Sequence, residues 1–207
     1  MTLDLFSPQP QTNLLPCDGV VEDHGLILNG GQSQKYLDYF LQHLAWEQDE
    51  VFLFGKHHVT ARKIAWYGDA NYQYHYSGSL KKAHIWQPAL LRLKQHIEQQ
   101  VGHPFNSCLA NLYEHGQQGM GWHSDNEASL MSKQHETVIA SLSFGATRKM
   151  RFKHNYTGNL VELLLQSGQL IVMRGQTQQF WKHQITKTTK VITPRINLTF
   201  RYFYPEN

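Results

Sequence analysis

Two side chains of metal-binding type lie two residues apart in His123-Ser124-Asp125. In an extended segment, residues i and i+2 point to the same side of the chain. A second histidine from elsewhere would complete a set of two histidines and one carboxylate. Such a set leaves three positions of an octahedral metal open and is typical of non-haem Fe(II) sites. The chain has 13 histidines, so this short pattern needs support from other residues.

Near the C-terminus, segment 195–201 alternates strictly between polar and apolar residues. The polar positions share one face of a strand, and they are Arg195, Asn197, Thr199 and Arg201. The opposite face carries Ile196, Leu198 and Phe200. Two interpretations remain open, because the polar face could lie in water or line a polar pocket.

The two arginines favour a pocket for a small dianion. They are six positions apart, which is about 20 Å along a strand, so their long side chains could reach both ends of one ligand. The guanidinium fork binds carboxylates in a bidentate manner. A dicarboxylic 2-oxo acid would also chelate Fe(II) through its keto and carboxylate oxygens, which leaves one metal position for O₂. The predicted metal site and the predicted site for a dianion therefore support each other.

We expect the second histidine ligand shortly before this strand. His183 follows Asp125 by 58 residues, precedes Arg195 by 12, and is the only histidine after His154. His154 is the alternative ligand. It adjoins the Asn- and Gly-containing segment 155–158, which is typical of a hairpin turn, so we expect His154 to be exposed.

These motifs together resemble the AlkB family of Fe(II)/2-oxoglutarate-dependent dioxygenases. The resemblance covers about residues 50–204 and includes HSD at 123–125, His183, RINLTFR at 195–201 and Asn111-Leu112-Tyr113. It implies a mainly β fold with flanking helices, in which a double-stranded β-helix (jelly-roll) core carries an N-terminal nucleotide-recognition lid.

The resemblance also implies a role for each matching residue. The catalytic iron would be held by His123, Asp125 and His183. Arg195 would pair with the far carboxylate of 2-oxoglutarate, and Arg201 would lie near its iron-bound end. The remaining cosubstrate contacts would come from Asn111, Tyr113, Asn197 and Thr199.

The segment 62–78 has the composition of a base-binding lid. Six aromatic or imidazole rings occur within residues 66–76, and such rings can stack on bases. The segment resembles the lid of the AlkB subgroup that repairs duplex DNA. That resemblance implies a finger residue at Phe54 and further substrate contacts from Arg62, Tyr74, Tyr76, Ser77 and Glu127. Two departures are Ala61, where the subgroup usually has Pro, and an acidic N-terminal arm in place of a basic tail.

The function that the resemblance implies is oxidative demethylation of N-alkylated DNA bases such as 1-methyladenine and 3-methylcytosine. The reaction would use Fe(II), 2-oxoglutarate and O₂ and release formaldehyde, succinate and CO₂. A cationic methylated base suits aromatic faces and a nearby carboxylate. The alternatives are an AlkB-like enzyme acting on RNA or tRNA, a small-molecule dioxygenase of the same fold, and a non-catalytic jelly-roll binding module.

Several elements must position these residues. Apolar spacing predicts helices over 33–46 and 88–101. Short strands are expected over 51–54 and 66–76, and then over 107–114, 137–144, 149–153, 160–165, 169–173, 179–185 and 195–204. We expect a loose arm over 1–20 and one domain over 21–207, with the lid at about 50–80 and the jelly-roll core at about 105–204.

Length, cysteine content and charge fit this interpretation. The 207 residues suffice for one core, and no apolar run approaches the roughly 20 residues that span a bilayer, so we expect no membrane partner. Two cysteines, Cys17 and Cys108, make no disulfide framework, so we expect a reducing compartment, the cytoplasm of a bacterium, and a monomer. Residues 1–50 have one base and eight acids, or −7, whereas residues 51–207 have 18 bases and eight acids, or +10. The basic part favours a nucleic-acid partner, DNA in duplex or single-stranded form.

Overall fold

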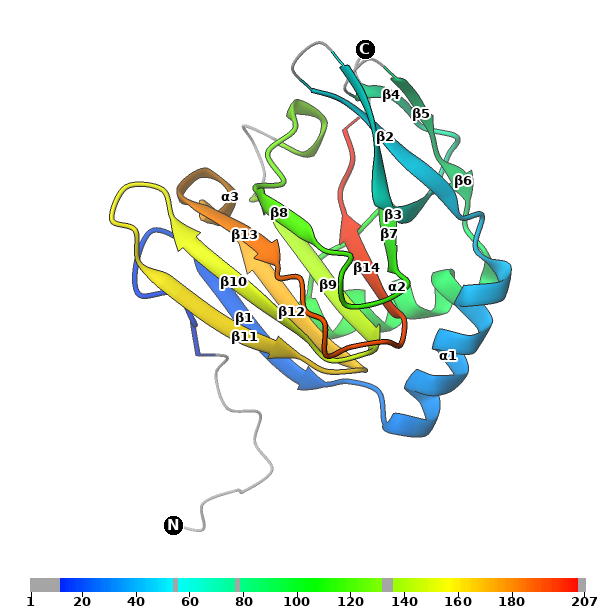
Figure 1. The fold of residues 1–207 in the computed structure, drawn as a ribbon, viewed down its shortest axis with the longest axis horizontal. Coiled ribbons are helices and arrows are strands. Elements are labelled where there is room, and N and C mark those ends of the chain that lie inside the picture. The colour runs from blue at the N-terminus through cyan, green and yellow to red at the C-terminus, as the bar shows by residue number, and fades with distance from the viewer. Residues whose placement is uncertain (1–11, 54–55, 77–78, 132–135, 205–207) are drawn as a thin grey trace.

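The computed structural model describes residues 12–53, 56–76, 79–131 and 136–204, and in 50–53, 56–58, 74–76 and 79–80 it describes the backbone alone. Two β-sheets are stacked face to face (Figure 1). The order in the larger sheet is β1 (Val20–Leu26), β12 (Gln169–Arg174), β9 (Val138–Gly145), β14 (Arg195–Arg201), β7 (Ser107–Tyr113), β3 (Lys56–Gly68) and β2 (Glu47–Leu53), all antiparallel, with β6 (His84–Ile85) parallel to β3. The order in the smaller sheet is β11 (Leu160–Leu165), β10 (Arg148–His154), β13 (Trp181–Ile185) and β8 (Met120–His123). This architecture is the expected jelly roll.

A separate hairpin is formed by β4 (Gln73–Tyr76) and β5 (Ser79–Lys82), which pair with each other alone. The hairpin lies beside β2 and β3 at the end of the sandwich where β8 and β14 also end (Figure 1). Lys81 of this hairpin lines the cavity between the sheets, and the role of a lid stays a prediction.

Two helices cover the outer face of the larger sheet. They are α1 (Gly30–His43) and α2 (Pro88–Val101), and their buried side chains include Phe40, Leu90 and Ile97. The same apolar cluster contains Leu198 and Phe200 of β14. The apolar face of β14 therefore packs under the helices, and its polar face turns toward the smaller sheet. This arrangement settles the open question about residues 195–201, because Arg195 is 1% exposed and does not lie on a solvated face.

The helix 88–101 is confirmed with the predicted bounds, ending at Gly102 in the left-handed conformation (φ 68°). The other helix starts at Gly30 rather than Ser33. Asn29 and Gln32 form a reciprocal capping box there, which begins the helix before its apolar face starts. A short helix, α3 (Thr177–Phe180), and a 3₁₀ turn, η1 (Ala128–Leu130), complete the helical elements of the described residues.

The strand expected over 66–76 is interrupted in the structure. β3 ends at Gly68, and β4 begins at Gln73. A Cβ atom at Gly68 would lie 2.7 Å from the Tyr72 ring, so the chain turns back closely at this glycine. Asp69 then accepts a hydrogen bond from the Trp86 indole, which fixes the turn.

Residues 13–17, which we expected within a loose arm over 1–20, pack against the core. Residues 1–11 lie outside the described part, but Leu15 is 4% exposed and packs among core residues of the sandwich. Asn13 bridges to Glu22 of β1, and the Cys17 carbonyl accepts a hydrogen bond from the Trp181 indole at 3.0 Å. Apolar burial and these hydrogen bonds hold residues 13–17 against the core.

Candidate metal centre and active site

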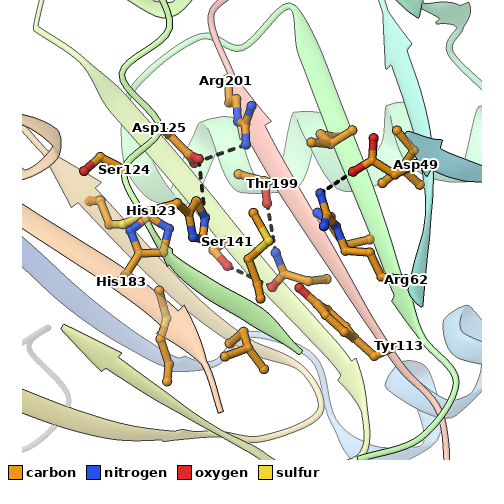
Figure 2. A pocket seen from close by; sticks show the side chains of 18 of the residues that line it. Asp49, Arg62, Tyr113, His123, Ser124, Asp125, Ser141, His183, Thr199 and Arg201 are labelled. Atoms are coloured by element: carbon orange, nitrogen blue, oxygen red, sulfur yellow. Dashed lines mark hydrogen bonds and ion pairs between the residues drawn. The ribbon is translucent and has the colours of Figure 1, made fainter. Parts of the chain in front are cut away.

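Three residues of metal-ligand type meet between the sheets. His123 lies at the end of β8, Asp125 follows it, and His183 lies on β13 directly across from His123. The two imidazole rings are 4.2 Å apart between centroids, and His123 Nε2 is 3.8 Å from Asp125 Oδ1 (Figure 2). One potential ligand atom from each residue lies within 4.8 Å of the others. Asp125 and His183 are buried, whereas His123 is partly exposed.

The protonation states of this cluster suit a divalent metal. His123 Nδ1 lies 2.9 Å from the Gly121 carbonyl, to which it donates, so Nε2 keeps its lone pair for a metal. Burial and the adjacent His123 lower the pKa of His183 to about 3, so its imidazole is neutral near pH 7. Burial tends to raise the pKa of Asp125, but its electrostatic interactions with Arg201 and with the neighbouring histidines outweigh burial and lower that pKa. Two imidazoles and a carboxylate form the donor set of a non-haem Fe(II) site.

Neighbouring side chains hold the Asp125 segment in place. The Asp125 N–H donates to Gln178 Oε1 at 2.9 Å, and Gln178, on α3, is 3% exposed. Ser124 Oγ donates to the Trp181 carbonyl at 3.2 Å. Arg201 donates to Asp125 Oδ2 at 3.1 Å. Asp125 is therefore oriented from three sides.

Arg195 supplies a buried cation in the same cavity. Its Nη2 donates to Ser143 Oγ and Asn197 Oδ1, both at 3.0 Å, and its guanidinium carbon is 5.6 Å from the Tyr113 ring centroid. Burial lowers the pKa of Arg195 to about 10. Nε and Nη1 of Arg195 are buried without a hydrogen-bond partner among the described residues. A buried cation with unused donors fits the far carboxylate of a dianion.

The residues predicted to contact the cosubstrate line this one cavity together with the three metal-ligand residues, and they are Asn111, Tyr113, Arg195, Asn197, Thr199 and Arg201. β14 pairs with β7 so that Arg195 faces Tyr113 and Asn197 faces Asn111. Asn197 is held by Ser141 Oγ at 2.9 Å and donates to Thr199 Oγ1 at 2.8 Å (Figure 2). Sheet pairing thus brings residues together that are about 85 positions apart in sequence. Their individual contacts to a cosubstrate stay predictions.

The structure places some of the predicted substrate residues in the cavity and does not describe the side chains of the others. Arg62 and Glu127 line the cavity, and Glu127 Oε2 is buried with no hydrogen-bond partner within the described ranges. Tyr74 and Tyr76 belong to β4, of which the backbone alone is described. Phe54 and Ser77 lie outside the described residues.

Two charged residues of the cavity, Asp49 and Lys81, were not predicted. Asp49, on β2, is 2% exposed and forms a 2.6 Å ion pair with Arg62. Lys81, on β5, is 3.4 Å from the other oxygen of the same carboxylate. In the sequence Asp49 belongs to the acidic run Glu47-Gln48-Asp49-Glu50, which is typical of a solvated strand, so no local signal separates it from its neighbours.

His154 is 2% exposed, so the expectation that it lies in water was wrong. The N-terminal segment covers it, with Asp18 Oδ2 3.2 Å from His154 Nε2. Its Nδ1 accepts the Thr157 N–H at 3.0 Å, so the ring proton lies on Nε2 and faces Asp18. His154 groups with Cys17 and Asp18 and not with the metal cluster. His183 therefore completes the set with His123 and Asp125.

Comparisons with known proteins identify the class. Residues 26–201 match the family model of the 2OG-Fe(II) oxygenase superfamily, so the chain belongs to that superfamily, whose members use Fe(II) and 2-oxoglutarate. Within it, the chain is 38% identical over 184 residues to "Alpha-ketoglutarate-dependent dioxygenase alkB homolog 3" of Bos taurus, covering 84% of this chain and 63% of the relative. It is 37% identical to human "DNA oxidative demethylase ALKBH2", covering 81% and 65%, and 33% identical to the mouse protein of that name, covering 95% and 85%. The chain is thus a member of the AlkB family.

The chain spans less than two thirds of the length of the bovine alkB homolog 3 and the human ALKBH2. Relatives of both names match at similar identity, so the comparisons do not single out the subgroup that repairs duplex DNA.

The solved structure of OsALKBH1 superimposes with a TM-score of 0.59 at 14% identity, covering 90% of this chain and 99% of that one, which supports the jelly-roll fold. No helix in the described part of the chain has the length and apolar character that a membrane crossing requires.

Proposed function

We propose that this chain is an Fe(II)- and 2-oxoglutarate-dependent dioxygenase that removes methyl groups from N-alkylated DNA bases. The observation that carries the proposal is one cavity lined by His123, Asp125 and His183 at one place and by the buried Arg195 at another. In the reaction, one oxygen atom of O₂ enters succinate and the other enters formaldehyde, while 2-oxoglutarate loses CO₂. The base nitrogen regains its lone pair when formaldehyde leaves, and one proton is released to solvent.

The bound iron would supply the oxidising chemistry with O₂ and the cosubstrate. The three ligand side chains would hold it and leave three positions for 2-oxoglutarate and O₂. Arg195 would orient 2-oxoglutarate by its far carboxylate, and Asn111, Tyr113, Asn197 and Thr199 would complete that pocket. Because Arg195 and Thr199 are buried, the cosubstrate would be held out of bulk water.

The proposed substrate class is a cationic methylated base, 1-methyladenine or 3-methylcytosine. The buried Glu127 Oε2 in the cavity wall could accept a hydrogen bond from such a base and balance its charge. Methylation blocks Watson–Crick pairing, so a lesion leaves the base stack at a lower cost than a normal base. Tyr74, Tyr76, Ser77 and the finger residue Phe54 would contact the nucleic acid.

One experiment compares oligonucleotides of the same sequence that carry 1-methyladenine or 3-methylcytosine in single-stranded DNA, duplex DNA and RNA. Mass spectrometry measures the repaired base, and formaldehyde is measured in the same reactions. We expect repair of DNA that requires both Fe(II) and 2-oxoglutarate. Repair of the RNA oligonucleotide alone would refute the DNA substrate and favour the alternative, an enzyme that acts on RNA or tRNA. Absence of repair in all three, from protein that binds Mn(II) and 2-oxoglutarate, would overturn the proposal.

The proposal includes a monomer in the bacterial cytoplasm that acts on duplex and single-stranded DNA. The +10 charge of residues 51–207 supports a polyanionic partner. Light scattering during size-exclusion chromatography tests the monomer, and a dimer mass would refute that part.

A further inference from the structure

Four polar side chains connect the β4–β5 hairpin to the floor of the cavity. Lys81 Nζ, from β5, is 3.4 Å from Asp49 Oδ1. Arg62, from β3, donates through Nη2 to Asp49 Oδ2 at 2.6 Å (Figure 2) and through Nε to Asn111 Oδ1 at 3.0 Å. Asp49 lies on β2 and Asn111 on β7. The chain of contacts therefore runs from the hairpin, through two strands, to a residue opposite Asn197 in the cosubstrate pocket.

Burial makes these contacts strong. The side chain of Asp49 is 3% exposed, and the side chains of Arg62 and Lys81 are 11% and 12% exposed. Charges at such depth are weakly screened, and loss of one partner leaves the others without compensation. Ion pairs on the surface are screened by solvent and contribute less. One such pair, formed by Lys63 of β3, serves as a comparison. Lys63 and Glu114 lie 2.8 Å apart with side chains 34% and 46% exposed.

The Arg62 contact also fixes the orientation of the Asn111 amide. An arginine has donors alone, so the amide oxygen of Asn111 must face Arg62. The NH₂ group of Asn111 then points to other partners. Because 2-oxoglutarate has hydrogen-bond acceptors alone, this orientation would leave the NH₂ group of Asn111 to donate to the cosubstrate.

We propose that Asp49 is a positioning residue that couples the β4–β5 hairpin to the cosubstrate pocket through Lys81 and Arg62. The proposal rests on the proposed function, because it takes the hairpin as the nucleotide lid and Asn111 as a cosubstrate contact. In this arrangement Asp49 would hold Lys81 of the hairpin beside the cavity and keep Arg62 against Asn111. Asp49 would thus act on nucleic-acid binding and not on the iron.

The opposite possibility is that Asp49 stands in for a phosphate of the nucleic acid and leaves when the substrate binds. Two features favour the positioning role. The carboxylate contacts the two cations through separate oxygens, and it is buried where an entering phosphate would first have to lose its water. The two roles predict opposite changes in nucleic-acid affinity when Asp49 loses its charge.

A first test needs no enzymatic activity. An isolated two-stranded hairpin is marginally stable in water, so loosening its attachment should expose its amides. In Asp49→Asn we expect amide hydrogens of residues 79–82 to exchange about tenfold faster than in wild type. The matched control Glu114→Gln removes the exposed ion pair with Lys63, which lies on β3 next to Arg62. It should change the exchange rate of these amides less than twofold. Unchanged exchange in folded Asp49→Asn would refute the attachment.

A second test measures demethylation kinetics. Asp49→Asn should raise KM for a methylated oligonucleotide about tenfold and leave kcat within threefold, and Asp49→Glu should recover part of the loss. Lys81→Met should raise the same KM and leave KM for 2-oxoglutarate unchanged. Tighter binding of an unmethylated oligonucleotide by Asp49→Asn would overturn the positioning role in favour of the phosphate stand-in. A wild-type protein that repairs no oligonucleotide would refute the proposed function, while the exchange test would still judge the attachment.

Discussion

Replacing Arg195 by methionine should separate cosubstrate binding from folding. The guanidinium is 1% exposed, and two of its nitrogens lack partners among the described residues. If they bind the far carboxylate of 2-oxoglutarate, Arg195→Met leaves a carboxylate in a buried site without its cation. Removing one partner of a buried charge pair costs about 3–5 kcal/mol, or about 100- to 4,000-fold in affinity.

The effect on stability should have the opposite sign in the absence of cosubstrate. Burial lowers the pKa of Arg195 from its ordinary value to about 10, and this shift corresponds to a cost of about 3 kcal/mol for keeping the buried charge. Methionine has a similar length and no charge. We therefore expect cosubstrate-free Arg195→Met to unfold at a temperature no lower than wild type does.

The assay combines thermal unfolding with calorimetric titration of 2-oxoglutarate in the presence of Mn(II). Wild type should gain stability as 2-oxoglutarate is added, and Arg195→Met should gain none at the same concentrations. Arg195→Lys should recover part of the binding, because a point charge replaces a fork. Arg92→Met, at an exposed position of α2, is the matched control. Equal 2-oxoglutarate affinity in Arg195→Met and wild type would remove Arg195 from the site.

Three further changes should have separate effects. The pKa of His183 falls from 6.5 in the unfolded chain to about 3 in the folded one. The metal-free protein should therefore lose stability as pH falls below about 6.5, by up to about 1.4 kcal/mol per pH unit. Urea unfolding should show a weaker dependence of stability on pH in His183→Asn than in wild type, and an equal dependence would contradict the assigned pKa. Gln178→Leu removes the acceptor for the Asp125 N–H and should weaken Mn(II) binding, measured by spin resonance, about tenfold, whereas unchanged affinity would exclude this positioning. Phe54→Ala should reduce repair of duplex DNA about 5- to 150-fold and repair of single strands much less, and an unchanged ratio would reject the finger role.

The parts of the site that lie on one strand could be predicted from the sequence. Alternation along 195–201 placed four polar residues on one face, because the side-chain period of a strand is two. The short spacing of His123 and Asp125 also predicted that their side chains meet, although β8 ends at His123 and Asp125 lies beyond the strand. The helix 88–101 was predictable because its apolar period, its Pro and its Gly agree.

The parts that depend on packing between distant strands could not be predicted. Asp49 becomes a buried residue of the cavity because β3 and β5 bring two cations to it, and no property of its own segment indicates that. His154 is buried because the N-terminal segment lies over it. A turn pattern reports local backbone preference and contains no information about a segment that packs on it from far away in sequence.

The most direct test of the metal centre measures succinate and formaldehyde together, with a methylated DNA oligonucleotide, Fe(II) and 2-oxoglutarate. Wild type should form the two products in a one-to-one ratio once turnover without substrate is subtracted. His183→Ala should abolish both, and His115→Ala, at an exposed histidine, should retain both. Product formation by folded His183→Ala at the wild-type rate would contradict the assignment of His123, Asp125 and His183 as the iron ligands.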